Sequence, residues 1–323
     1  MSQQNESNKH IEISLEILKR FKKELKFDLY VQRSPGSFTK IFKTGDQLDW
    51  ERVVSYLKKG ISYFYCTEEE YQIYAQYVER LGEQLSNPNN KMTSKEAVKL
   101  LKELAQYTMH EMCMKMNVTE RAVSNAGNVI AGCIDNLGKD PSSTMKIIQL
   151  MSMQPYIMKH SIMVSLLSVL LGKETGIESD TNLKIIGMGG FLHDVGVGQL
   201  DFDPEDERVL TPEQRKEVGR HPELGKQMLD GVKNLRTETL QIVLQHHEQP
   251  NGHGYPNGMR DAEIYPPAKI VAICDTFAAM VTKRTYRDAF SPAEAISRMR
   301  DNIGKFDKRV LETFAGIVIR NNT

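Results

Sequence analysis

The sequence contains few cysteines and no excess of charge of either sign, and both absences restrict what the protein can be. Only four of the 323 residues are cysteine, scattered at positions 66, 113, 133 and 274 without a Cys-X-X-Cys pair. This pattern argues against a disulfide framework and fits a reducing compartment. The 42 basic residues balance 42 acidic ones. No global positive field is therefore present to attract a nucleic-acid polymer, although a local cluster could bind a small anion.

Long hydrophobic runs are also missing. The longest apolar stretch, IMVSLLSVLLG at 162–172, is too short to span a bilayer and is typical of a core helix. The first ten residues, MSQQNESNKH, are polar and lack the apolar segment of a secretory signal. We therefore expect a cytoplasmic protein without a membrane span.

Residues 1–85 are expected to form a small α/β domain. DLYVQR and FTKIFK alternate around the turn sequence SPGS, which predicts a hairpin, and ISYFYC predicts a further strand. The spacing of residues 11–26 predicts a helix with a basic, solvated face. Asp49 and Gly60 are at cap positions around a second helix, and Thr67 and Glu70 have the spacing of a capping box before a third.

The polar, turn-forming segment SNPNNKMTS at 86–94 predicts a linker, and long methionine-rich helices follow it. A methionine stripe is usually adaptable core packing and seldom a set of ligands. These helices could connect the domains or form a homodimer interface. The predicted parts are residues 1–85, a helical linker region at 86–150 and a helical domain at 151–323.

The chemistry of the chain centres on residues 246–256, HHEQPNGHGYP. Two adjacent histidines close the amphipathic segment LQIVLQ, and the glycines and prolines that follow must end a helix there. Imidazole is the commonest neutral metal ligand, and clustered histidine and carboxylate suit zinc, iron or manganese better than calcium. This segment therefore predicts a metal site.

Further candidate ligands lie tens of residues apart along the chain. The candidates are His160, His193, Asp194, His221, His246, His247 and Asp275. They can converge only if several helices pack together and each contributes a ligand, as in carboxylate–histidine centres of helical bundles. Asp275 lies in the apolar segment KIVAICDTFAAMV, where a buried carboxylate is costly unless it is paired or ligated.

Three ordered motifs carry a family resemblance. LHDVG at 192–196, HHEQPNGHGYP at 246–256 and AKIVAICDTFAAMVTKRTYRDAFSPAEAI at 268–296 resemble the HD-GYP family of bacterial metal-dependent phosphodiesterases, a branch of the HD superfamily. The resemblance covers roughly residues 150–320. It implies a mostly α fold, in which a helical HD-type bundle follows the small α/β N-terminal domain. It also implies hydrolysis of cyclic di-GMP to linear pGpG or GMP.

The resemblance further implies two divalent metal ions, iron or manganese, bridged by Asp194. His160, His193 and Asp275 would hold one ion, and His221, His246 and His247 the other. Asp194 and His193 are the expected catalytic residues. Two such ions can bind a phosphate oxygen and generate the attacking hydroxide.

Four residues are expected to bind the substrate: Lys283, Arg284, Arg287 and Tyr255. Arg284 and Arg287 would share a face on a helix, and guanidinium matches phosphate with paired donors. Spacing alone favours a solvated surface pair, whereas the neighbouring metal cluster favours ligand binding. By resemblance, the Gly254-Tyr255-Pro256 loop shapes the site and contacts protein partners, and the N-terminal domain is regulatory.

Two positions depart from the family pattern. Val197 occupies the place of the lysine in the family's HDxGK motif, and Tyr156 occupies the place of the glutamate found in members with three metals. We therefore expect two metals at most. Val197 favours a second hypothesis, a metal-loaded receptor with slow or no catalysis. A third is a phosphodiesterase for another cyclic dinucleotide, such as cyclic GMP-AMP.

Overall fold

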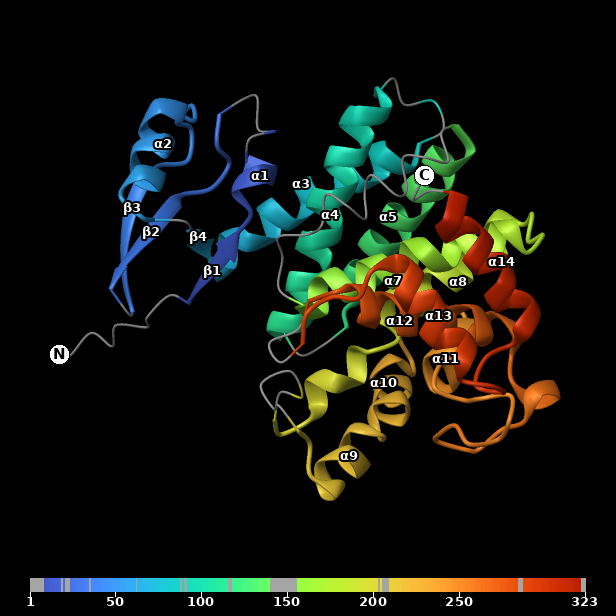
Figure 1. Ribbon diagram of the computed structural model, residues 1–323. Coiled ribbons are helices and arrows are strands. Elements are labelled where there is room, and N and C mark those ends of the chain that lie inside the picture. The colour runs from blue at the N-terminus through green and yellow to red at the C-terminus, as the bar shows by residue number, and fades with distance from the viewer. Residues whose placement is uncertain are drawn as a thin grey trace. The chain divides into compact units, whose positions relative to one another are not determined.

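Figure 1 shows a computed structural model of the chain. It describes residues 9–320 apart from 19, 21–23, 35, 62, 88, 90–91, 116–117, 140–155, 203, 205–208 and 284–286. The chain divides into two compact units, Met1–Gln84 and Leu85–Thr323. The predicted fold class, mostly α with a small α/β region at the N-terminus, is confirmed.

The first unit is built on a four-stranded antiparallel sheet in the order β1-β4-β2-β3. Its strands are β1 (His10–Ile13), β2 (Leu29–Ser34), β3 (Ser37–Phe42) and β4 (Phe64–Thr67), and its helices are α1 (Leu15–Leu18), α2 (Trp50–Lys58) and α3 (Glu68–Ser86). β2 and β3 form the predicted hairpin. Leu29, Val31 and Phe64 are buried, so one face of the sheet contributes to the core.

The helix predicted for residues 11–26 is wrong in its first part. His10–Ile13 forms an edge strand that pairs with Phe64–Thr67, and only Leu15–Leu18 is helical among the described residues of that range. The spacing of the apolar residues there fits both a helix and a strand. Pairing with a strand more than fifty residues away decides between them, because strand formation depends on tertiary context.

The predicted caps are present in the structure. Asp49 Oδ1 accepts hydrogen bonds from the backbone N–H groups of Glu51 and Arg52 at the start of α2. Thr67 and Glu70 exchange side-chain and backbone hydrogen bonds at the start of α3, as a capping box requires. Gly60, just beyond α2, has φ +82°, a conformation that glycine adopts without strain.

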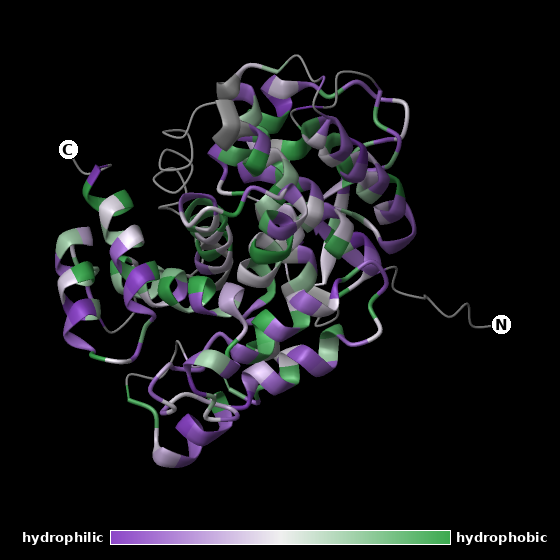
Figure 2. Cartoon of the chain, turned by 90° about the vertical axis from the view of Figure 1, so that its right-hand side faces the viewer, coloured by the Kyte–Doolittle hydropathy of each residue, from purple (hydrophilic) through white to green (hydrophobic). Residues whose placement is uncertain are grey.

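The second unit is helical. Its elements are α4 (Ser94–Lys115), α5 (Glu120–Lys139), α7 (Tyr156–Glu174), α8 (Asp180–Leu192), η1 (Val195–Gln199), α9 (Pro212–Val218), α10 (His221–Leu229), α11 (Thr237–Gln245), η2 (Asp261–Glu263), α12 (Pro266–Val281), α13 (Pro292–Asp301) and α14 (Lys308–Arg320). Thr211 and Ser291 cap α9 and α13, each followed by proline. Hydrophilic and hydrophobic residues alternate along most helices in Figure 2, as expected of helices with one face in a core.

Helix α8 is at the centre of this unit and packs against α5, α7, α11 and α12. Glycines make the close packing possible. A Cβ atom at Gly189 would lie 2.5 Å from a side-chain carbon of Ile242 on α11. One at Gly190 would lie 3.0 Å from the Ser165 backbone on α7. The segment GMGG thus fixes the position of the α8 C-terminus, where His193 and Asp194 follow.

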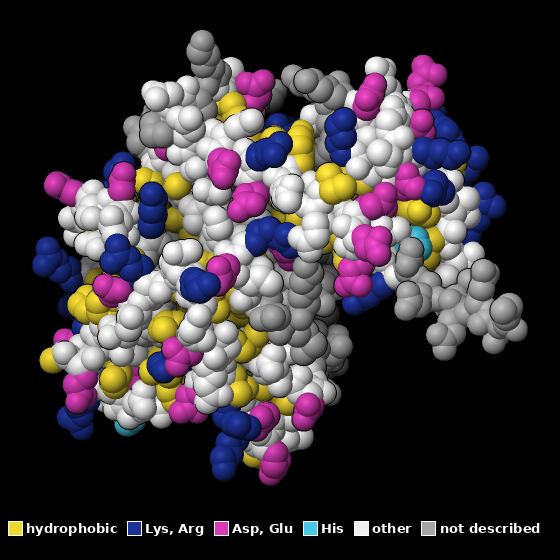
Figure 3. All heavy atoms as spheres, turned by 180° about the vertical axis from the view of Figure 1, so that it is seen from behind, with side chains coloured by type: hydrophobic (Ala, Val, Ile, Leu, Met, Phe, Trp, Pro, Cys, Tyr) yellow, Lys and Arg dark blue, Asp and Glu magenta, His cyan; other side chains and the backbone are white. Residues whose placement is uncertain are grey.

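None of the described helices has the length and hydrophobicity needed to cross a bilayer. On the face shown in Figure 3, acidic and basic side chains are interspersed. Cys66, Cys133 and Cys274 are buried free thiols.

Candidate metal centre

The structure brings all seven predicted ligands together in the second unit. His160 comes from α7, His193 and Asp194 follow α8, His221 begins α10, His246 and His247 follow α11, and Asp275 comes from α12. Two overlapping sets have ligand atoms within 4.8 Å of one another. One contains His160, His193 and Asp194, and the other contains Asp194, His221, His246 and His247.

Asp194 is shared because its two carboxylate oxygens face opposite sets of imidazoles. Oδ2 lies 3.2 Å from His193 Nε2 and 3.8 Å from His160 Nε2. Oδ1 lies 3.3 Å from His221 Nε2 and 3.9 Å from His246 Nε2. We call the first group, with Asp275, the inner side, and His221, His246 and His247 the outer side.

Asp275 closes the inner side but also reaches the outer one. Its Oδ1 lies 2.9 Å from His160 Nε2 and 3.8 Å from His193 Nε2. Its Oδ2 lies 4.0 Å from His247 Nδ1. Asp275 is only 9% exposed, so its carboxylate is in contact with imidazoles where burial alone would be costly.

Three of the histidines are oriented by the same device. His193, His221 and His246 direct Nδ1 at the carbonyl oxygen three residues earlier, at 2.9, 2.8 and 2.7 Å. Those carbonyls lie at the C-terminal ends of α8, α9 and α11, where they lack a partner within the helix. A carbonyl only accepts, so Nδ1 carries the proton and Nε2 presents its lone pair to the cluster.

Two glycines let η1 and α10 approach closely. A Cβ atom at Gly196 would lie 2.1 Å from the carbonyl oxygen of His221 and 2.5 Å from the backbone nitrogen of Gly225. No side chain fits there. This contact holds the segment that follows Asp194 against the helix that begins with His221, and so fixes the distance between these two ligands.

The field of the cluster keeps its carboxylates ionised. Burial would raise the pKa of Asp194, but His193, His221 and His160 outweigh it and lower the pKa well below its usual value. Burial would likewise lower the pKa of His193, but the Asp194 carboxylate raises it to about 9. The inner side thus favours positive charge, and a divalent cation could replace that proton.

On the outer side, the adjacent histidines His246 and His247 favour the neutral form. Burial, reinforced by the neighbouring imidazoles, lowers the pKa of His246 well below its usual value. Burial also lowers the pKa of His247, to about 4. Neutral imidazole is the form of histidine that binds metal.

The donor set fits a divalent metal. Within the described chain, the buried His193 Nε2 makes no well-aligned hydrogen bond, although Asp194 Oδ2 lies 3.2 Å away and the ring is held in place through Nδ1. Such a nitrogen is costly in a protein interior unless something binds it. Neutral imidazoles combined with ionised carboxylates suit transition-metal ions. The cluster could therefore hold divalent metal, with Asp194 able to contribute to both sides.

Tyr255 lies over the outer side. Its ring centroid is 4.7 Å from that of His247 and 6.4 Å from that of His221. Its backbone N–H donates to the His247 carbonyl at 3.2 Å. The Gly254-Tyr255-Pro256 loop thus folds back onto the histidine pair that precedes it, and the predicted substrate-binding Tyr255 is beside the cluster.

Glu248 is a positioning residue that the sequence did not reveal. It is 3% exposed, and its two carboxylate oxygens accept from the backbone N–H groups of Asn257 and Met259 at 2.7 and 2.8 Å. These bonds hold both ends of the segment after Pro256, and with it the loop that carries Tyr255. The one available signal was an acidic residue directly after a histidine pair.

The predicted cationic residues lie at the end of α12, in a segment that is not helical at its described positions. Arg287 donates to the carbonyl oxygen of Ala279 at 2.7 Å, which satisfies the C-terminus of α12. Lys283 is exposed and pairs with Asp288 at 3.2 Å. Arg284 lies outside the described residues. Helix α12 ends at Val281. The shared helical face of Arg284 and Arg287 and their contact with substrate stay predictions.

The two departures from the family pattern lie in η1 and at the start of α7. Val197 is half-buried in η1, and the η1 sequence VGVGQ contributes no charge next to Asp194. Tyr156 is the first residue of α7, and its side chain lies outside the described residues.

Known proteins resemble this chain in both sequence and fold. A cyclic di-GMP phosphodiesterase of Pseudomonas aeruginosa is 30% identical over 182 residues, 56% of this chain and 44% of that protein. A 3′3′-cGAMP-specific phosphodiesterase of Vibrio cholerae is 29% identical over 183 residues, 52% of this chain and 38% of that protein. The chain thus spans less than half the length of these curated relatives.

A solved structure shares the fold of nearly the whole chain. An HDG"Y"P protein from Bdellovibrio bacteriovorus aligns with a TM-score of 0.71 and 20% identity, over 96% of this chain and 100% of that one. The resemblance to the HD-GYP branch is confirmed by these matches. The HD domain family model matches residues 148–310, half of the sequence, and the chain therefore belongs to the HD domain family.

Proposed function

We propose that this chain is a metal-dependent phosphodiesterase that opens a cyclic dinucleotide, with cyclic di-GMP as its substrate and linear pGpG or GMP as its product. One observation carries the proposal: the two oxygens of Asp194 face two separate groups of imidazoles. That arrangement suits two ions sharing one carboxylate. The names of the bacterial relatives support the substrate class.

Each residue has a defined part in this proposal. His160, His193 and Asp275 would hold one ion, His221, His246 and His247 would hold the other, and Asp194 could contribute an oxygen to each. The iron or manganese ions would supply positive charge for the phosphate and lower the pKa of the attacking water. The backbone carbonyls behind His193, His221 and His246 keep the rings oriented. Tyr255 covers the outer side and limits how the substrate enters.

The test is hydrolysis by the full chain loaded separately with Fe²⁺ or Mn²⁺ under anaerobic conditions. We expect cyclic di-GMP to be converted to pGpG or GMP, and chromatography measures these products. Asp194→Asn keeps the size of the side chain but removes its charge. We expect it to lower turnover by at least about a thousandfold, because the loss of both ions removes most of the catalytic charge. Turnover by Asp194→Asn at the wild-type rate would sink the proposal.

A second candidate is a receptor that binds the cyclic dinucleotide with slow or no hydrolysis. The observation that favours it is the uncharged η1 segment around Val197. A third is hydrolysis of another cyclic dinucleotide such as cyclic GMP-AMP, and one relative is named for that activity. Binding without turnover would support the receptor, and faster turnover of cyclic GMP-AMP than of cyclic di-GMP would support the third. The cytoplasmic location, the homodimer and protein partners at the Gly254–Pro256 loop stay predictions.

A further inference from the structure

A pocket of about 580 Å³ lies beside the outer side of the cluster. Its lining comes from α9, the start of α10 and the loop that carries Tyr255. We call it the α9 pocket, and its lining includes Arg215, Lys216, Val218, Arg220, Glu223 and Tyr255.

The pocket and the cluster share parts of the chain. Val218 lines the pocket, and its carbonyl oxygen accepts from Nδ1 of His221. Tyr255 also lines the pocket, while its ring lies against His247. The least buried ligands of the cluster are Asp194 and His247, with side chains 25% and 26% exposed. Val218 and Tyr255 therefore connect the pocket to the outer side of the cluster.

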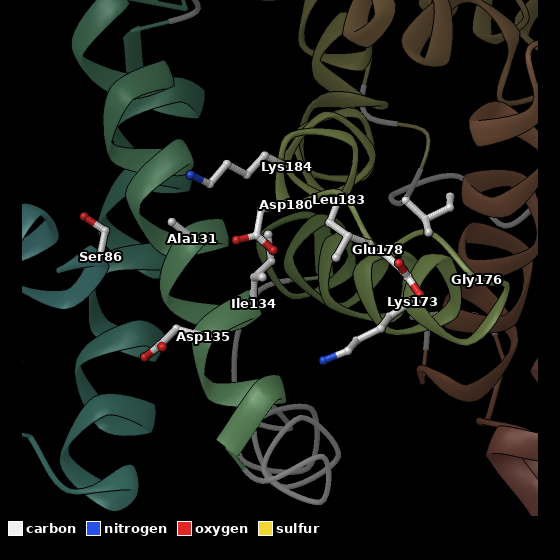
Figure 4. Close-up of a pocket in the computed structure, with 11 residues that line it drawn as sticks. Ser86, Ala131, Ile134, Asp135, Lys173, Gly176, Glu178, Asp180, Leu183 and Lys184 are labelled. Carbon is white, nitrogen blue, oxygen red and sulfur yellow. The ribbon is translucent and has the colours of Figure 1, made fainter. Parts of the chain in front are cut away.

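The pocket is rich in cations. Arg215, Lys216 and Arg220 line it, against one acidic residue, Glu223. Arg220 also pairs with Glu217 at 2.6 Å. The pocket of about 610 Å³ in Figure 4, between α5 and the α7–α8 region, is different, because its two lysines are accompanied by Asp135, Glu178 and Asp180. The α9 pocket therefore suits an anion, and the other does not.

We propose that the α9 pocket binds the second phosphate of the cyclic dinucleotide, the one that is not being cleaved. This inference rests on the proposed function. A cyclic dinucleotide carries two phosphodiesters on one ring, so a second anionic group stays near the cluster when the first is bound there, and the adjacent cation-lined pocket suits it. The neighbouring η1 segment contributes no cation. Arg215, Lys216 and Arg220 supply positive charge that the segment after Asp194 lacks, and Arg215 can offer paired donors to a phosphate.

The test compares two substrates on the full, metal-loaded chain. Cyclic di-GMP has a second phosphate, and bis(4-nitrophenyl) phosphate has only the one that is cleaved. We expect Lys216→Gln combined with Arg215→Gln to raise the KM for cyclic di-GMP at least about tenfold, with kcat changed much less, because two charge-assisted contacts are lost. The loss in kcat/KM should be at least about five times larger for the dinucleotide than for the small ester.

Two further variants separate a contact from a structural effect. Arg215→Lys keeps the charge and should restore most of the affinity that Arg215→Gln loses. Lys308→Gln combined with Arg309→Gln removes the same charge from exposed positions at the start of α14, and should leave both substrates unaffected. An equal loss for both substrates, or the same KM increase in the α14 variant, would overturn the pocket assignment.

The outcomes also distinguish the pocket from the proposed function. If the wild-type chain hydrolyses only the small ester but binds cyclic di-GMP, hydrolysis of the dinucleotide is refuted. The dissociation constants of the wild-type chain and of the Arg215/Lys216 double variant for cyclic di-GMP then replace KM in the comparison. Equal constants would refute the pocket assignment. If the wild-type chain neither binds nor hydrolyses cyclic dinucleotides, both inferences are wrong.

Discussion

The inner and outer sides of the cluster use the same kinds of ligand in different surroundings. On the inner side, His160 and His193 are almost fully buried and face two carboxylates, Asp194 and Asp275. On the outer side, His221 and His246 face Oδ1 of Asp194, and His247, partly exposed beneath Tyr255, lies 4.0 Å from Oδ2 of Asp275. The inner side therefore faces both carboxylates of the cluster, whereas the outer side contains more of its imidazoles, including the partly exposed His247.

This difference suggests a division of roles. A cation on the inner side would be held by two carboxylates at low local dielectric, where their attraction is strongest. A cation on the outer side would be held by fewer charges and would be reachable by the substrate. The inner ion should therefore be retained more firmly, and the outer ion should be the more exchangeable.

The largest expected effect comes from removing the charge of the inner side. Asp275→Asn should weaken retention of the first metal ion by at least about a hundredfold, because a buried ionic ligand becomes neutral. His247→Ala, on the outer side, should weaken the second ion by about tenfold. Metal content after dialysis against graded chelator concentrations measures both. Equal metal retention by the two variants would contradict the proposed difference between the inner and outer sides.

The next effect concerns the contact that sets the distance between the two sides. Gly196→Ala should lower the free energy of unfolding by about 2 kcal/mol or more, since its Cβ would meet the backbone of α10. Gly198→Ala is the matched control, because nothing lies within 4 Å of its Cβ position. We expect it to change stability by less than about 0.5 kcal/mol. Denaturant unfolding of both variants compares them, and similar losses would argue against the close approach.

A smaller effect is expected where the outer side is covered by its loop. Glu248→Gln replaces one acceptor oxygen by an amide NH₂ that faces a backbone donor, so one of the two buried hydrogen bonds is lost. We expect kcat/KM for the dinucleotide to fall about tenfold as Tyr255 loses its fixed position. Amide hydrogen exchange at Asn257 and Met259 should accelerate. Unchanged exchange at both positions would mean that Glu248 does not hold the loop.

The smallest effect should come from adding charge at the opening. Val197→Lys places an ammonium in η1, close in sequence to Asp194, and should raise kcat/KM for cyclic di-GMP about threefold by attracting the phosphate. Val197→Met, which is uncharged, is the control for side-chain length. Equal rates in the two variants would show that charge at this position does not limit the enzyme.

Much of the site followed from the sequence because its ligands lie at recognisable helix ends. Helix α8 stops at His193 and α11 at His246, where the glycines and prolines that follow required an end. Asp275 stood out as a carboxylate within an apolar helix. The hairpin and the caps at Asp49, Thr67 and Thr211 followed from local turn and capping chemistry, which acts over a few residues.

The rest depends on contacts between distant segments. Residues His10–Ile13 could not be assigned to a strand without their partner, Phe64–Thr67. The contact of Gly196 with α10 and the two bonds accepted by Glu248 arise only after the helices have packed. Arg287 likewise carries a side chain suited to binding phosphate, but its guanidinium donates to the carbonyl oxygen of Ala279 near the end of α12.

The hydrogen bonds from Nδ1 of His193, His221 and His246 to helix-terminal carbonyls have a consequence for how quickly the centre can be assembled. Each ring is already locked by the fold, so its rotational freedom is lost during folding and not when a cation arrives. Metal uptake should therefore be a fast, rigid docking event. The protein should reach its full secondary structure in the presence of chelator, unlike small domains that fold only around their ion.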